Sequence, residues 1–148
     1  MAIRLAIGPS PRRIDTGTEV SPGRGVVLRH GADAILFAYG PVMLHEALTA
    51  AELLESRGLG LTVVNMPWLN RFDGAWLMEV VRERERLFVV EDHSPVGGLG
   101  DALRRELAGR EVTVLGVAGW PVCGTPAEAL RAHGLDGASL ADRIHPAT

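Results

Sequence analysis

Short apolar runs alternate with segments of helical periodicity along most of this chain. Five runs of four to six residues are rich in Val, Ile and Leu on both faces, at 26–29, 34–39, 61–65, 87–90 and 112–117. Strands of a parallel sheet that is covered on both faces have this composition. The pattern predicts a three-layer α/β domain with a mostly parallel five-stranded sheet. Few residues separate the first two runs, so we expect an antiparallel first strand in a hairpin-like pair with the second.

Helical segments fill the spaces between these runs. Pro41 lies near the start of the first, which Gly58 ends. Between them, apolar residues recur at spacings of four, three and four, as on one face of a helix: Met43, Ala47, Ala50 and Leu54.

Capping signals mark two further helices. Asp73 is a candidate N-cap for a helix that buries Leu77, Val80 and Val81, and the charged run 82–86 is predicted to form its solvated end. Thr125, Pro126 and Glu128 combine an N-cap, a first-turn proline and a capping-box glutamate. We expect Gly134 to end that helix.

The first part of the chain has a different character. Residues 8–25 are rich in Gly and Pro without periodicity, and a short strand-like piece precedes them. Such an opening is typical of the cut end of a larger protein. We therefore expect residues 1–24 to be an extended arm, the end of a preceding domain or a linker, and residues 25–148 to be the folded domain.

Composition excludes several classes of function. At 148 residues, with 47% hydrophobic and 22% charged residues, the chain fits one globular domain. A net charge of −3 and the lack of an arginine stripe with interleaved aromatics argue against nucleic acid. All 15 basic residues are arginine, which excludes lysine chemistry. No signal peptide or apolar run of the ~20 residues of a membrane span is present, so we expect a cytoplasmic protein.

Cysteine and histidine spacing gives no metal site. With one cysteine, Cys123, no internal disulfide can form, and no Cys/His cluster has zinc spacing. No base lies near Cys123 in the sequence. A buried, inert thiol is therefore favoured over a nucleophile.

The segment 86–103 carries the candidate chemistry. An apolar run ends in two acidic residues and His93, and a glycine-rich crossing at 97–100 then leads into a helical segment. The crossing lacks GxGxxG and GK[ST] spacing, so close backbone packing is favoured over nucleotide binding. His93 has two interpretations: a surface or hydrogen-bonded histidine, or a proton donor or substrate contact in a shared active site.

Several motifs, taken in order, are similar to the carboxyl-terminal domain of the transketolase family, which includes transketolase, deoxyxylulose-phosphate synthase and 2-oxoacid dehydrogenase beta subunits. The resemblance covers nearly the whole chain. Its most specific parts are Gly23-Arg24-Gly25, Gly31-Ala32-Asp33, Gly40, Pro67 with Asp73, Glu91 to Gly100, Gly124, and His133-Gly134-Leu135-Asp136.

This resemblance implies a split or excised section of a thiamine-diphosphate enzyme. In the family, two other domains bind thiamine diphosphate and magnesium across a dimer interface, and this chain has no GDG motif of its own. The implied partner is a chain with the diphosphate- and pyrimidine-binding domains, in a homodimer or heterotetramer. No catalytic residue and no metal ligand is expected here, and the chain should be inactive alone.

The resemblance also implies contacts with substrate and partner. Arg4 matches a substrate-binding arginine of the family, whereas Ile7 stands where sugar-phosphate members carry a second one. Isoleucine cannot make charge-assisted bonds to phosphate, so we expect an unphosphorylated substrate, or phosphate held by another group. His93 is the second expected substrate contact. Trp68 and Phe72, expected to be exposed on a loop, are candidate interface residues together with Gly97, Gly98 and Gly100.

Three functions remain open. In the first, the chain is the third domain of an enzyme that transfers a two-carbon ketol or acyl unit. In the second, it is a non-catalytic dimerisation or docking module of a 2-oxoacid dehydrogenase-type complex. The third possibility is a free-standing sensor of a small ligand.

Overall fold

The computed structural model describes residues 12–14 and 21–146. Strands and helices alternate along the chain, as the hydrophobic pattern predicts. In order they are β1 (Val26–Arg29), β2 (Ala34–Ala38), α1 (Pro41–Ser56), β3 (Leu61–Asn65), α2 (Gly74–Val81), β4 (Arg86–Val90), α3 (Leu99–Glu106), β5 (Val112–Leu115), α4 (Pro126–Ala132) and α5 (Gly137–Ile144).

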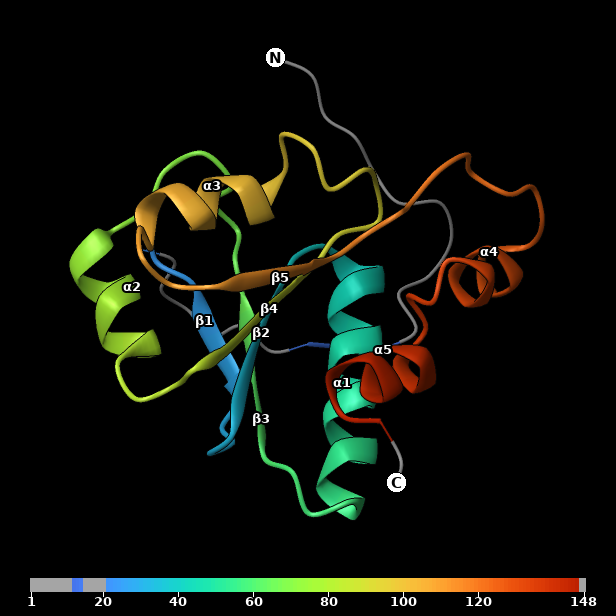
Figure 1. Ribbon diagram of the computed structural model, residues 1–148, viewed down its shortest axis with the longest axis horizontal. Helices are drawn as coiled ribbons and strands as arrows, with labels where there is room; N and C mark the ends of the chain where they lie inside the picture. Colours follow the sequence, from blue (N-terminus) through green and yellow to red (C-terminus); the bar gives the residue numbers. More distant parts are fainter. Residues whose placement is uncertain (1–11, 15–20, 147–148) are drawn as a thin grey trace.

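The sheet lies between two layers of helices, with α1 and α5 on one face and α2 and α3 on the other (Figure 1). Strand residues alternate between two cores. Leu36 and Val63 belong to the core under α1 and α5, whereas Phe37 and Val64 belong to the core under α2 and α3. This alternation is the period of two that an extended strand imposes. The predicted three-layer α/β fold is confirmed.

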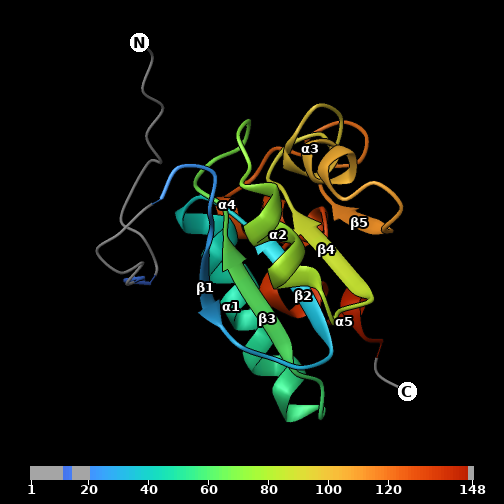
Figure 2. The same cartoon turned by 90° about the vertical axis from the view of Figure 1, so that its left-hand side faces the viewer.

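The strand order is β1-β3-β2-β4-β5, as Figure 2 shows. β1 is antiparallel to β3, and all other pairs are parallel. The antiparallel first strand is therefore confirmed, but the predicted hairpin between β1 and β2 is wrong, because β3 lies between them.

The connection between β1 and β2 passes closely over the start of β3. A Cβ at Gly31 would overlap the backbone of Gly60 and Leu61. Thr62 holds the crossing, since its Oγ1 accepts from Gly31 N at 2.9 Å and donates to Gly31 O at 2.8 Å. The pairing of β1 with β3 depends on this contact between segments about 30 residues apart in the sequence. Patterns of neighbouring residues cannot predict such a contact.

Most predicted helix boundaries are confirmed. Met43, Ala47, Ala50 and Leu54 are all buried on one side of α1. Asp73 caps α2, and the capping box of α4 is formed. The charged run 82–86 was expected as the end of a helix, but α2 ends at Val81, residues 82–85 form the turn, and Arg86 begins β4.

One helix was not predicted from the sequence. α5 begins after Asp136, whose side chain accepts from Ser139 N, and it buries Leu140, Ala141 and Ile144 against α1 and the sheet. Its N-cap, Asp136, comes only two residues after Gly134, the expected end of the preceding helix.

The predicted arm 1–24 falls mostly outside the described residues, and Arg4 and Ile7 lie wholly outside them. Its boundary with the folded domain stays a prediction. Within the described part of the chain, no helix is long and apolar enough to span a membrane.

Candidate functional site

Polar side chains gather where the parallel strands β2, β3 and β4 end. Tyr39 follows β2, Asn65 ends β3, and Glu91 and His93 follow β4. In open α/β sheets, ligands bind outside the carboxyl ends of the strands. This edge is therefore the candidate site.

Glu91 is a fully buried carboxylate at 0% exposure. Its Oε2 accepts from Leu99 N at 2.8 Å and its Oε1 from Gly100 N at 3.0 Å. The N-cap of α3, Gly98, has no side chain, so Glu91 supplies the cap from the position just after β4. Buried N–H groups need acceptors, and a negative charge is favourable at a helix N-terminus. Glu91 therefore fixes α3 to the end of β4.

His93 is the exposed member of this cluster, with 44% of its side chain accessible. Its Nδ1 lies 2.7 Å from the carbonyl oxygen of Ser94, so Nδ1 must carry a proton and donate. In the neutral ring Nε2 is then the acceptor, and the hydroxyl of Tyr39 donates to it at 2.6 Å. Glu91 Oε2 lies 3.3 Å from the same Nε2. The cluster can hold or pass a proton at Nε2.

The glycine-rich crossing packs against the chain itself. A Cβ at Gly98 would overlap Glu91, and a Cβ at Gly100 would overlap Val114 of β5. Gly97 is exposed and has a positive φ of 78°. The interpretation as close backbone packing is confirmed. A contact of these glycines with a partner chain stays a prediction.

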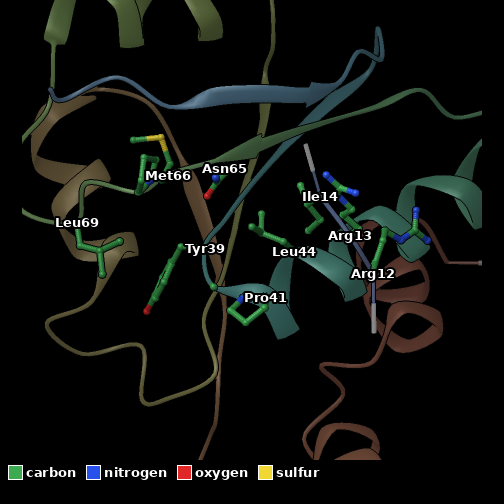
Figure 3. A pocket seen from close by; sticks show the side chains of 11 residues that line it. Arg12, Arg13, Ile14, Tyr39, Pro41, Leu44, Asn65, Met66 and Leu69 are labelled. Carbon is green, nitrogen blue, oxygen red and sulfur yellow. The ribbon is translucent and has the colours of Figure 1, made fainter. Parts of the chain in front are cut away.

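Two hollows lie at this edge. One, of about 540 Å³, is lined by Tyr39 and by residues of α1 and β3 (Figure 3). The other, of about 620 Å³, is lined by His93 and by the segment that leads from β5 into α4. The hydrogen bond between Tyr39 and His93 joins the walls of the two hollows.

The aromatic residues expected to be exposed on a loop are both half-buried. Phe72 packs against the core under α2 and α3. The indole Nε1 of Trp68 is buried and has no hydrogen-bond partner among the described residues. The expected full exposure is wrong, for Phe72 because it packs against this core, and the interface role of both residues stays a prediction.

The prediction of a buried thiol is also wrong, since Cys123 is exposed. It lies between β5 and α4, in a segment whose residues 118–128 are all exposed. Trp120 in the same segment is 93% exposed, and Val96 in the crossing after β4 is 83% exposed. The sequence did not predict that these two apolar side chains are exposed, and it did not indicate Tyr39 as a member of the site. The signal for Tyr39 was its position at a strand end before Gly40.

Comparisons with known proteins agree with this geometry. The family model described as "Transketolase, C-terminal domain" matches residues 23–140. The 1-deoxy-D-xylulose-5-phosphate synthase of Synechococcus sp. (strain JA-2-3B'a(2-13)) is 34% identical over 136 residues, which are 88% of this chain and 21% of that protein. The synthase of Chlorobium luteolum is 34% identical over 152 residues, which cover 97% of this chain and 24% of that protein. The chain thus spans between a fifth and a quarter of these relatives.

Solved structures show the same fold. A structure described as a split gene transketolase in an inactive beta4 tetramer has a TM-score of 0.78 and 33% identity, and the match covers 86% of this chain and 43% of that one. A transketolase mutant from Pichia stipitis has a TM-score of 0.63 at 20% identity, covering 81% of this chain and 17% of that one.

Proposed function

This chain belongs to the family of transketolase C-terminal domains, and we propose that it is one section of a thiamine-diphosphate-dependent transferase. The other domains of that enzyme, which bind the diphosphate and the pyrimidine, lie outside these residues. The assembled enzyme transfers a two-carbon ketol or acyl unit. The observation that carries the proposal is the similarity to the split gene transketolase, together with the small share of the synthases that the chain matches.

The described residues do not fit the cofactor by themselves. Transketolases and deoxyxylulose-phosphate synthases depend on thiamine diphosphate. No group of three His, Cys, Asp or Glu side chains in the described ranges is arranged to hold a metal ion. The buried carboxylate of Glu91 uses both oxygens on α3. We therefore propose that the partner domains, and not this chain, bind thiamine diphosphate and magnesium.

The role proposed for this chain is to complete a shared active site with His93. In the neutral ring, Nδ1–H is fixed by Ser94 O and Nε2 accepts from Tyr39. A substrate hydroxyl or carbonyl that replaces the Tyr39 contact would meet an oriented nitrogen that can accept or, once protonated, donate. Glu91 holds the crossing in place, and its Oε2 lies 3.3 Å from Nε2.

Contact with the partner is proposed at the two crossings beyond β4 and β5. Val96 and Trp120 are large apolar side chains left exposed; Val96 follows His93 by three residues, and Trp120 lines the same hollow as His93. Aromatic residues are enriched where protein chains meet. A partner that covers them would also remove His93 from bulk water.

The test is reconstitution with a candidate partner that carries the other two domains. The full chain alone is expected to show neither ketol nor acyl transfer, and activity should appear in the complex. Trp120→Asp should weaken assembly, measured by analytical ultracentrifugation. His93→Ala should lower kcat/KM of the complex without weakening assembly.

His30→Ala is the matched control, because His30 is exposed on the connection between β1 and β2, far along the chain from the crossings. Transfer activity of the isolated chain would overturn the proposal. If the His30 and His93 variants change kcat/KM of the complex equally, the proposed role of His93 is overturned, but the proposed assembly is not.

A further inference from the structure

The hollow of about 620 Å³ beside His93 is formed by several separate parts of the chain. Its walls are the first turn of α1, the residues after β4, the segment from β5 to α4, and α4 with the turn that follows it. Figure 1 shows the segment from β5, in orange, extending beyond the sheet before α4 begins. The volume falls within the range of about 300–1,000 Å³ that is typical of small-molecule sites.

Hydrogen bonds within the chain hold these walls together. Val117 N donates to His93 O at 2.9 Å, which joins the segment after β5 to the segment after β4. Val122 N donates to Nε2 of His133 at 3.2 Å, which fixes the segment before α4 to the end of that helix. The hollow is therefore held open by this chain alone, and small-molecule sites are usually formed in this way before the ligand binds.

Most of the lining is apolar, and among the described residues it contains no arginine. The larger apolar side chains come from several of the walls: Val42, Val117, Trp120, Val122, Leu130 and Leu135. Asp92 is the only carboxylate in this lining. Because a charge that leaves water without a partner costs free energy, an anionic ligand is disfavoured here. The lining therefore favours an uncharged, mainly apolar molecule over a phosphate or a carboxylate.

Two neutral hydrogen-bond donors belong to the polar part of the lining. His133 accepts from Val122 at Nε2, so the neutral ring carries its proton on Nδ1, and this N–H donates to no described residue. The hydroxyl of Ser94 accepts from Val96 N at 3.4 Å and keeps its own proton to donate. A ligand that meets both donors needs an acceptor with two lone pairs, and an uncharged carbonyl oxygen supplies them.

We propose that this hollow binds a small uncharged molecule with an aromatic apolar body and one carbonyl group. The apolar walls contact the body, and the donors of Ser94 and His133 bind the carbonyl oxygen. Trp120 lines the hollow and is almost fully exposed, so its indole ring is available to pack against an aromatic ligand. The site is formed by this chain alone and does not rest on the function proposed above.

The experiment titrates the full chain with acetophenone, benzoate and ethylbenzene. These probes share a benzene ring and carry a neutral carbonyl group, a carboxylate and no polar group, respectively. NMR follows the indole N–H of Trp120 and the ring protons of His133, and the shifts give the dissociation constants. Acetophenone should bind about ten-fold more tightly than benzoate, whose charge is uncompensated in the hollow. It should bind roughly five-fold more tightly than ethylbenzene, which is the net value of one hydrogen bond between neutral groups.

Two variants test the two parts of the site. Leu130→Ala should weaken acetophenone binding roughly ten-fold, because each buried methylene group contributes a factor of about four to the affinity. Leu53→Ala is the matched control, since Leu53 is also a half-buried helical leucine that packs against the core under α1 and α5, but it does not line the hollow. Ser94→Ala should remove most of the preference for acetophenone over ethylbenzene and leave the affinity for ethylbenzene unchanged.

The proposal is overturned if benzoate binds as tightly as acetophenone, or if the signals of Trp120 and His133 do not shift. Equal affinities for acetophenone and ethylbenzene would reveal a purely apolar groove, such as a side chain of a partner protein fills, and would also overturn it. Equal weakening by the Leu130 and Leu53 variants would do the same. If Leu130→Ala does not fold, the three wild-type titrations and Ser94→Ala still decide.

Discussion

Replacing Glu91 with alanine should destabilise the domain strongly and locally. The side chain is fully buried and accepts from the N–H groups of Leu99 and Gly100, which are themselves buried. Each buried donor left without an acceptor costs about 1–3 kcal/mol, so the pair gives about 4 kcal/mol for Glu91→Ala. Glu91→Gln keeps one acceptor oxygen and should cost about half of that. Small domains have a total stability of about 5–15 kcal/mol, so the alanine variant stays folded but is marginal.

Urea unfolding followed by circular dichroism measures the change in free energy. At roughly 3 °C per kcal/mol for a chain of this size, Glu91→Ala should lower Tm by about 12 °C. Native-state hydrogen exchange should show lost protection at Leu99 and Gly100 before the rest of the sheet. Glu111→Ala, at an exposed residue before β5, is the control and should change little. A loss below about 1 kcal/mol with unchanged protection of α3 would refute the reasoning.

Three further changes test other parts of the fold. Gly100→Ala places a Cβ into a valine of β5, so overpacking should cost about 1–3 kcal/mol in urea unfolding, and a neutral result would contradict this packing. Thr62→Val removes the hydroxyl that bonds both backbone groups of Gly31 and should cost about 1–3 kcal/mol, whereas unchanged stability would show that the crossing does not need it. Glu128 accepts from the backbone and the hydroxyl of the α4 N-cap, which lowers its pKa below the ordinary 4.5. Its stabilisation is therefore present above pH 4.5 and lost as pH falls through the folded pKa, and Glu128→Gln should remove this part of the acid response. An NMR titration that gives Glu128 a pKa of 4.5 or higher would contradict that sign.

Local sequence signals predicted what depends on neighbours along the chain. The five strands, the N-cap at Asp73 and the capping box of α4 were all predicted from residues a few positions apart. The contacts of Tyr39 with His93 and of Glu91 with α3 were not predicted, although the ends of β2 and β4 were. Tyr39 and His93 are 54 residues apart, and only the parallel pairing of β2 and β4 brings them together.

The sequence by itself determined the layered α/β fold, because apolar periodicity decides which faces must be buried and caps decide where helices start. It also carried the motifs that place the chain among transketolase C-terminal domains. Only the tertiary structure decided the insertion of β3 between β1 and β2, the partial burial of Phe72 and the exposure of Cys123. These depend on which distant segments pack together. Outside the periodic segments, the exposure of a residue follows from such packing, and local spacing does not encode it.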